Sequence, residues 1–317
     1  MTALDANDFT SALQNADAAL ASEPDNVVAL LNKATALEQQ GSLQFKEKEL
    51  GTQAIALAQQ ALAINSKSSD AWRIIGYAYE IMQRYPEAHD AYSKSLALNP
   101  ANAATISQDA HAYDLEGDYT RAESGYTQAL QIDPNLDHAR MGLARMLVAR
   151  GKLDDALAQY KLVMQSSSNA RQKAEAAYSA GVIQNAQKKT AEAEVLMRQA
   201  IDLDPSYAQG WGGLGEVLFA ESVNQAKIGS DTGLAKLVDE SLAAFGKSIA
   251  LNPNLANAQL QLALSMVALG DDQRALTVIN ETIKTIPNDI TLSAPSKQIL
   301  AKQATALLVF INSQKGK

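Results

Sequence analysis

Two stretches of nine residues, Tyr-Ser-Lys-Ser-Leu-Ala-Leu-Asn-Pro at 92–100 and Tyr-Thr-Gln-Ala-Leu-Gln-Ile-Asp-Pro at 126–134, share one pattern of residue types. Their prolines lie 34 positions apart, and the prolines of Asn-Pro at 252–253 and Ile-Pro at 286–287 are again 34 apart. Proline cannot continue a helix, because it lacks a backbone N–H and its ring clashes with the preceding turn. Each stretch therefore predicts the end of a helix, and the fixed spacing predicts a repeat architecture.

Large and small residues upstream of the first stretch follow the spacing of a helical hairpin. Trp72 can fill the gap between two paired helices, whereas Gly76 and Ala88 allow close approach. The full series resembles the consensus of the tetratricopeptide repeat family: Trp72, Ile75, Gly76, Tyr79, Tyr85, Ala88, Tyr92 and Pro100, with a second close copy in Trp211, Leu214, Gly215 and Leu218. This resemblance extends over nearly the whole chain and implies an all-α, right-handed α-solenoid.

The register of the resemblance divides the chain into about seven helical hairpins within a single superhelical domain, residues 1–317. Asp8 to Ala21 reads as the second helix of an incomplete N-terminal repeat, and residues 295–312 read as a C-terminal capping helix. A repeat array needs such ends, because a bare terminal repeat leaves its apolar face in water. The expected repeats are residues 27–68, 69–102, 103–136, 137–173, 174–207, 208–255 and 256–289.

Three of the expected repeats are longer than the 34-residue period. The extra residues lie around Ser42 to Leu50, around Gln165 to Arg171 and around Ser222 to Ala235. The last insertion is the longest and contains Ile-Gly-Ser-Asp-Thr-Gly at 228–233, a composition typical of a loop. Two interpretations of it stay open: a contact element for a partner, and a plain loop that joins a longer pair of helices.

The composition supports closely packed helices and disfavours several other classes of protein. Hydrophobic residues make up 47% of the 317 residues and aromatic residues only 5%, which suits helices that contact one another through alanine. A net charge of −8 and an isoelectric point near 5.0 argue against a nucleic-acid partner, because phosphates require a basic surface. The absence of cysteine excludes disulfides and thiolate metal ligands.

No stretch of the sequence has the length and apolar content of a membrane span, so we expect no direct membrane insertion of this chain. Residues 1–13 lack the basic and apolar regions of a signal peptide. Two locations stay open: the cytoplasm, or the periplasm if a signal or anchor has been removed. The abundance of Ala, Gln and Asn gives the impression of a bacterial protein.

Motifs for catalysis or cofactor binding are weak in this sequence. Residues 210–215, Gly-Trp-Gly-Gly-Leu-Gly, match the dinucleotide-binding pattern G-x-G-x-x-G, but that site requires a preceding strand and the sequence predicts a helix there. The glycines are therefore interpreted as packing residues. His89, His111 and His138 lack the spacing that places two metal ligands on one helical turn. We expect no catalytic site, no cofactor and no metal ion, and hence a non-enzymatic protein.

One charged residue falls at an expected core position. Asp109 stands where the family usually has a buried leucine, and a buried carboxylate without a partner is costly. Arg140 occupies the place of the usual tryptophan in the next repeat, so one interpretation is a buried ion pair between Asp109 and Arg140 of neighbouring hairpins. A catalytic role for Asp109 is the minor alternative. His89, on a second helix, is expected to face solvent.

In the tetratricopeptide family, the first helices of successive repeats line a concave groove. The corresponding positions here combine polar and aromatic side chains, which suits an extended peptide whose backbone requires hydrogen bonds. A plain solvated face is the alternative. The resemblance implies a peptide- or protein-binding groove made of Arg73, Tyr77, Gln108, His111, Asp114, Met141, Arg145, Tyr178, Glu216 and Phe219. The pattern of the carboxylate-clamp subtype is not matched, since its places hold Arg73, Tyr77, Gln108, His138 and Gly142.

The sequence therefore predicts a scaffold or adaptor that binds a peptide or protein partner in this groove. The alternative is a structural repeat protein that forms homo-oligomers, because the expected C-terminal helix carries the apolar residues Ile299, Leu300, Leu307, Leu308, Phe310 and Ile311. An enzyme is a weaker third hypothesis, since no group of acid–base or nucleophilic residues emerges.

Overall fold

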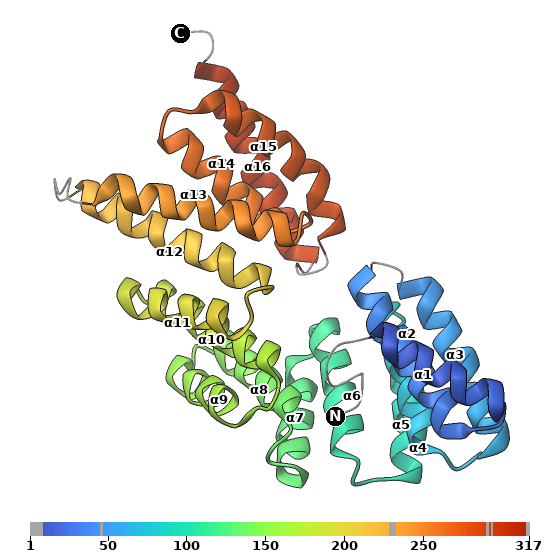
Figure 1. Cartoon of the computed structure of the whole chain (residues 1–317). Helices are drawn as coiled ribbons and strands as arrows, with labels where there is room; N and C mark the ends of the chain where they lie inside the picture. The colour runs from blue at the N-terminus through green and yellow to red at the C-terminus, as the bar shows by residue number, and fades with distance from the viewer. Residues whose placement is uncertain (1–8, 45–46, 228–232, 290–291, 293, 315–317) are drawn as a thin grey trace. The chain divides into compact units, whose positions relative to one another are not determined.

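The computed structural model describes residues 9–44, 47–227, 233–289, 292 and 294–314. Throughout these residues the regular structure consists of α-helices and one short 3-10 helix, with no strand. Figure 1 shows the helices lying in pairs along the chain. The protein is thus an all-α solenoid, as the repeat spacing predicts.

The chain divides into two compact units, residues 1–159 and 160–317, and the division falls within α9 (Leu153–Ser166). The single superhelical domain expected from the sequence stays a prediction. The N-terminal unit contains α1 (Phe9–Ser22), α2 (Val27–Gln44), α3 (Glu47–Ile64), α4 (Ser69–Ile81), α5 (Tyr85–Leu98), α6 (Ala103–Glu116), α7 (Tyr119–Ile132) and α8 (Asp137–Ala149). The C-terminal unit contains α10 (Ala170–Ala186), α11 (Thr190–Leu203), α12 (Ala208–Lys227), α13 (Leu234–Leu251), α14 (Ala256–Ala268), α15 (Asp272–Thr285), η1 (Ile286–Asn288) and α16 (Ala294–Gln314).

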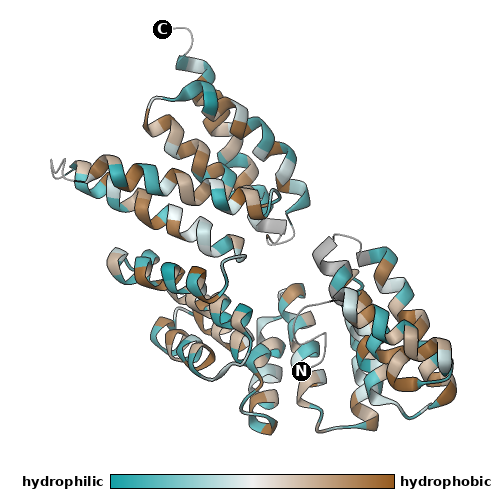
Figure 2. Ribbon diagram, in the orientation of Figure 1, coloured by the Kyte–Doolittle hydropathy of each residue, from teal (hydrophilic) through white to brown (hydrophobic). Residues whose placement is uncertain are grey.

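The helices pack as hairpins, and each hairpin packs on the next one in its unit. In the N-terminal unit α2 pairs with α3, α4 with α5, and α6 with α7, while α1 packs on α2. In the C-terminal unit α10 pairs with α11, α12 with α13, and α14 with α15. Apolar and polar residues alternate around each helix (Figure 2), so the apolar stripes meet inside the hairpins.

The C-terminal helix α16 covers the apolar face of the last hairpin. Its residues Leu300, Leu307 and Ile311 are buried in a core formed with α14 and α15. Ile299 and Phe310 point away from that core and are 59% and 48% exposed. The helix therefore caps the array with one face and leaves a second apolar face in solvent.

The turn between the two helices of a hairpin requires a left-handed backbone at the fifteenth repeat position. Five such turns among the described residues hold Gly117 (φ 86°), Gly151 (φ 72°), Gly270 (φ 79°), Gln83 (φ 59°) and Lys188 (φ 62°). Glycine adopts a positive φ without steric cost, whereas a side chain at this conformation clashes with its own backbone. Gln83 and Lys188 therefore store local strain.

Exchanging Gln83 and Gly117 tests this strain within one unit. Gln83 is exposed, and a β-carbon added at Gly117 would meet nothing within 4 Å, so the exchange acts mainly through the backbone conformation. We expect Gln83→Gly to raise the free energy of unfolding by about 0.5–1 kcal/mol and Gly117→Gln to lower it by about 1 kcal/mol. Urea denaturation measures both; shifts of the same sign would show that the turns tolerate either residue.

A large side chain at the twenty-fourth repeat position fills the space between helices. Tyr92, Tyr126, Met197 and Ile279 occupy this position in the regular repeats, and each is almost fully buried. Tyr92, Tyr126 and Met197 pack against glycines of the first helices: a methyl group added to Gly76 would come within 2.5 Å of Tyr92 Cδ1, and one added to Gly213 within 2.6 Å of Met197 Sδ. The glycines are needed because these side chains leave no room for a β-carbon.

The insertions lengthen helices. Helices α12 and α13 have 20 and 18 residues, against 13 or 14 in the regular hairpins α4–α5 and α6–α7. The loop sequence predicted around Gly229 falls mostly on residues 228–232, which lie outside the described part of the chain. The first insertion likewise extends α2 and α3, with residues 45–46 outside the described part.

Candidate functional site

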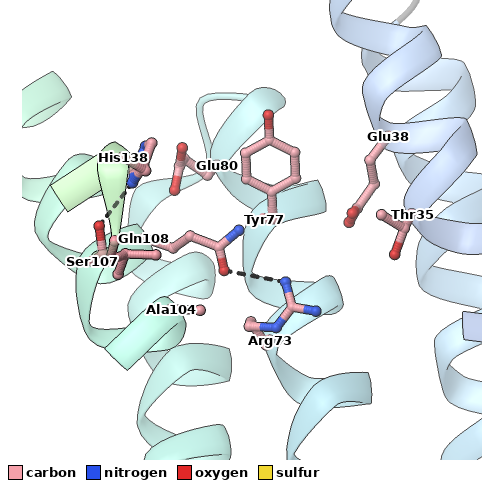
Figure 3. A pocket seen from close by; sticks show the side chains of 10 residues that line it. Thr35, Glu38, Arg73, Tyr77, Glu80, Ala104, Ser107, Gln108 and His138 are labelled. Atoms are coloured by element: carbon pink, nitrogen blue, oxygen red, sulfur yellow. Dashed lines mark hydrogen bonds between the residues drawn. The ribbon is translucent and has the colours of Figure 1, made fainter. Parts of the chain in front are cut away.

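The first helices of the N-terminal unit enclose a polar cavity of about 240 Å³. It is lined, from α2, α4, α6 and the start of α8, by Thr35, Glu38, Arg73, Tyr77, Glu80, Ala104, Ser107, Gln108, Leu136 and His138. In Figure 3, Thr35 and Glu38 of α2 face Arg73 and Tyr77 of α4 across the cavity. Arg73, Tyr77 and Gln108, which the resemblance places in a groove, thus lie at one cavity.

Arg73 brings a positive charge to this cavity. Its Nη1 donates to Gln108 Oε1 at 3.4 Å (Figure 3), and its Nε lies 3.5 Å from Asp70 Oδ1. Both distances are at the long end for hydrogen bonds, so these contacts hold the guanidinium only loosely. The side chain is 23% exposed, which leaves it accessible from the cavity.

Acidic residues recur at the twelfth position of three successive repeats, as Glu38, Glu80 and Asp114. Glu80 is buried, and its two oxygens have separate partners: Tyr92 donates its hydroxyl to Oε2 at 2.7 Å, and His111 Nδ1 lies 2.7 Å from Oε1. Asp114 Oδ2 accepts a hydrogen bond from Arg145 Nη2 at 3.1 Å. Both carboxylates are therefore satisfied by groups of the protein.

Glu38 is different. Its side chain is 2% exposed, and among the described residues its Oε1 has no hydrogen-bond partner. Burial raises the pKa of Glu38 well above its usual range; the neighbouring Glu80 adds to this rise, whereas Arg73 and a backbone hydrogen bond with Ala78 work against it. A buried polar atom without a partner is uncommon in proteins, and in a cavity wall it marks a place where a ligand can bind.

His138 forms the far wall of the cavity as a neutral group. Its Nδ1 lies 2.7 Å from Ser107 Oγ, a contact drawn in Figure 3. Burial lowers the pKa of His138 to about 3, with smaller contributions from His111 and Arg145. The imidazole is therefore uncharged at neutral pH and takes part in the cavity as a hydrogen-bonding ring.

The other expected groove residues of this unit lie beside the cavity. His111, Asp114 and Arg145 make the contacts described above, and Arg145 Nη2 also donates to Tyr126 Oη at 3.3 Å. Met141 lies on α8, is half-buried and is not part of the cavity lining.

The three expected groove residues of the C-terminal unit have separate surroundings. Tyr178 packs edge-to-face on Tyr207, with ring centroids 5.7 Å apart, and burial raises its pKa. Glu216 accepts a hydrogen bond from Asn257 Nδ2 at 2.8 Å, and burial raises its pKa as well. Phe219 lines an apolar cavity of about 540 Å³ between α12 and α13. Within this unit, the three residues do not share one cavity.

The predicted ion pair between Asp109 and Arg140 is wrong. Asp109 Oδ1 lies 2.5 Å from His89 Nδ1, because Asp109 faces α5 of the preceding hairpin. Arg140 instead donates to Gln159 Oε1 at 3.0 Å and to the carbonyl of Pro134. Burial raises the pKa of Asp109, and the hydrogen bond to His89 opposes the rise.

His89 does not face solvent as expected. Its side chain is 19% exposed, its Nε2 lies 2.9 Å from Glu116 Oε2, and its ring stacks on Tyr113 at a centroid distance of 4.0 Å. The imidazole therefore joins the two carboxylates of α6, Asp109 and Glu116, to α5. This cluster has the character of a structural link between hairpins.

Glu38 is among the lining residues that the predicted groove does not contain. The first repeat is longer than the 34-residue period, which obscures the register of its first helix. Counting twelve positions from residue 27 reaches Glu38, just as counting from residues 69 and 103 reaches Glu80 and Asp114. The recurrence of acids at one repeat position was the available signal.

The glycine-rich stretch 210–215 lies within α12, where its glycines contact neighbouring side chains such as Met197 and Phe245. Among the residues that the structure describes, no three His, Cys, Asp or Glu side chains are grouped so that they could hold a metal ion. Over the same residues, no helix combines the length and apolar character that crossing a membrane requires.

Comparison with known families gives four matches along the chain. Models described as tetratricopeptide repeat match residues 1–44, 69–102, 115–178 and 174–207, which together make up more than half of the sequence. The comparison with curated proteins gives no match.

Several solved structures have a similar fold. A chain of the APC/C hetero-tetramer Cut9–Hcn1 is 19% identical with a TM-score of 0.66, over 93% of this chain and 52% of that one. Yeast Tom70 is 16% identical with a TM-score of 0.60, over 97% of this chain and 59% of that one. A monomeric mutant of IFIT1 with Gppp-AAAA is 16% identical with a TM-score of 0.61, over 96% of this chain and 74% of that one. This chain thus spans little more than half the length of the first two, and the likeness concerns the fold alone.

Proposed function

Because the chain belongs to the tetratricopeptide repeat family, we propose that it is a non-enzymatic protein-interaction scaffold that binds an extended segment of a partner protein at the first helices of its N-terminal unit. The observation that carries this proposal is the polar cavity among α2, α4, α6 and α8. Repeat proteins expose the first helices of successive hairpins as one surface, and a cavity on that surface gives a partner side chain a place to enter.

The chemistry of the cavity wall suits a peptide. Gln108 and Ser107 offer hydrogen-bonding groups for a backbone, and the Tyr77 ring offers an apolar surface. Arg73 and Glu80 add charges of both signs, which select among partners rather than attract every chain of one charge.

A capture experiment with a cavity variant tests this proposal. In Tyr77→Ala with Gln108→Ala, the wall loses an aromatic surface and a hydrogen-bonding group, so we expect recovery of the partner from a native lysate to fall about tenfold or more. Quantitative mass spectrometry on the wild type and the variant measures the recovery.

The matched control carries the same two substitutions on α7, outside the cavity. Tyr119→Ala with Gln131→Ala removes two exposed side chains of the same types. It is expected to keep the partner. A partner that all three proteins retain equally would show that binding takes place elsewhere on the chain.

The exposed face of α16 favours a second candidate function, self-assembly. Ile299, Val309 and Phe310 are 59%, 63% and 48% exposed on one helix, an apolar surface that capping does not use. If copies associate through this face, Phe310→Glu is expected to lower the sedimentation coefficient of the concentrated protein to that of a monomer. A wild-type protein that already sediments as a monomer at high concentration contradicts self-assembly.

A further inference from the structure

One rule of repeat geometry governs the acidic side chains of the first helices. The ninth residue of the following hairpin supplies a partner to the acid: His111 contacts Glu80, and Arg145 contacts Asp114, each 31 residues further along the chain. An imidazole can carry a positive charge and a guanidinium always does. In the second and third repeats, the protein thus provides its own nitrogen donor for the carboxylate.

The first repeat breaks this rule. The ninth residue of the hairpin that follows Glu38 is Tyr77, which lines the same cavity but carries a phenol and brings no positive charge. Glu38 Oε1 lies buried in the wall, and none of the described residues forms a hydrogen bond with it. The place that His111 and Arg145 fill in the later repeats therefore lacks a cation here.

The charges around the cavity also indicate that a positive charge is missing beside Glu38. The wall holds two carboxylates, Glu38 and Glu80, and one guanidinium, Arg73. Arg73 contacts Gln108 and Asp70, and His138 is neutral. When Glu38 ionises, the residues that line the cavity present two carboxylates and one guanidinium, so an added cation beside Glu38 is favoured electrostatically.

Given the binding surface proposed above, we propose that this cavity receives a lysine side chain from the extended segment of the partner protein and that Glu38 Oε1 accepts a hydrogen bond from its ammonium group. Lysine suits the site better than arginine. An ammonium is a compact point charge that can bind to a single acceptor such as Glu38 Oε1, whereas a guanidinium binds a carboxylate best through two acceptors in the plane of its fork.

Proton release is a direct consequence of this proposal. The titratable groups that act on Glu38 are Arg73 and Glu80 of α4, and it interacts with the Tyr92 phenol of α5. Among the described residues, no charged group of α1 or α3, which also pack on α2, shifts the pKa of Glu38. Burial holds the pKa of Glu38 high, so bound ammonium stabilises the ionised form and releases a proton. Binding of a lysine segment should therefore strengthen as the pH rises through the pKa of Glu38.

The test uses the full chain and random twelve-residue peptides displayed on phage. We expect the selected peptides to share a lysine at one fixed position. The consensus peptide is then synthesised with lysine, arginine or norleucine at that position, and its affinity is measured by titration calorimetry. Replacing lysine by norleucine, which keeps the alkyl chain and removes the charge, should weaken binding about tenfold to a hundredfold.

Two variants of the wall give opposite expectations. In Glu38→Gln, the ratio of the affinities for the lysine and norleucine peptides should fall to about twofold or less, since the charged acceptor is gone. In Arg73→Gln, the same ratio should rise, because a competing cation has been removed from the wall. General damage to the fold would weaken both peptides alike in both variants, so a ratio that moves in opposite directions is specific to the charge of the cavity.

The outcomes separate the two proposals. A library from which no peptide is enriched overturns peptide binding and the lysine pocket together. Peptides that are enriched without a fixed lysine, or whose preference for lysine persists in Glu38→Gln, overturn the lysine pocket and leave the binding surface standing.

Discussion

Gly142→Ala is expected to lower the free energy of unfolding of the N-terminal unit by about 3 kcal/mol. The added methyl group would come within 2.6 Å of Tyr126 Cε2 and closer still to two other atoms of the ring. Tyr126 is completely buried, so its ring has no free space in which to move. Urea denaturation followed by far-ultraviolet circular dichroism measures the loss.

A second glycine of the same unit provides the control. An alanine β-carbon at Gly51, in α3, would meet Ala78 O, Met82 Cγ and Met82 Sδ at 3.4 Å, which is ordinary contact. Because alanine favours helix over glycine by about 1 kcal/mol, Gly51→Ala should be neutral or slightly stabilising. Equal stability of Gly142→Ala and Gly51→Ala would refute the tight packing of Tyr126 on α8.

Acidification from pH 7 to pH 4 should remove about 2–3 kcal/mol of stability through His138 alone. Burial, with help from His111 and Arg145, lowers the pKa of His138 to about 3, below the value near 6.5 of an unfolded chain. As the pH falls below about 6.5, the unfolded chain therefore binds a proton that the folded chain refuses, and the loss continues down to about pH 3. Partial exposure of the ring places the expected loss below the full conversion of the shift.

The difference between wild type and His138→Gln isolates this contribution from the titration of carboxylates. Glutamine keeps a group that can hydrogen-bond to Ser107 and does not titrate. The variant should therefore lose less stability than the wild type between pH 7 and pH 4. If the free energy of unfolding falls equally with pH in the two proteins, the buried position of the His138 imidazole is contradicted.

Glu38→Gln should show the opposite dependence on pH. The folded pKa of Glu38 is raised, so its neutral form is tolerated below about pH 4.5, and the wild type loses stability as the pH rises through the folded value. Relative to the wild type, Glu38→Gln should thus gain stability on going from acid to neutral pH, by about 1.4 kcal/mol for each unit by which the pKa is raised.

The secondary structure could be predicted from local sequence because each element carries its own stop signal. Proline ends the second helix at Pro100 and Pro134, and glycine at Gly117 and Gly151 supplies the left-handed turn inside the hairpin. These signals act on the backbone of a few residues and need no knowledge of distant neighbours. Gln83 and Lys188 show that the turn keeps its conformation where the glycine is absent.

The composition of the cavity was predicted only in part. The repeat register identified Arg73, Tyr77 and Gln108, because equivalent positions of a repeat point to equivalent faces. The register did not show which of the three acids at the twelfth position lacks a hydrogen-bond partner, because the partner comes from the next hairpin. Glu80 and Asp114 have such partners in His111 and Arg145, whereas Glu38 Oε1 is buried without one among the described residues.

By itself, the sequence determined that this protein is an all-α solenoid of repeated hairpins, because period, proline and glycine act locally and recur. Only the tertiary structure decided which ionisable groups meet. Asp109 pairs with His89 rather than Arg140, and Glu38 lies buried without a hydrogen bond to its Oε1 from any described residue. The reason is physical: the register states which face of a helix a residue occupies, whereas a pairing depends on distances between hairpins that packing alone sets.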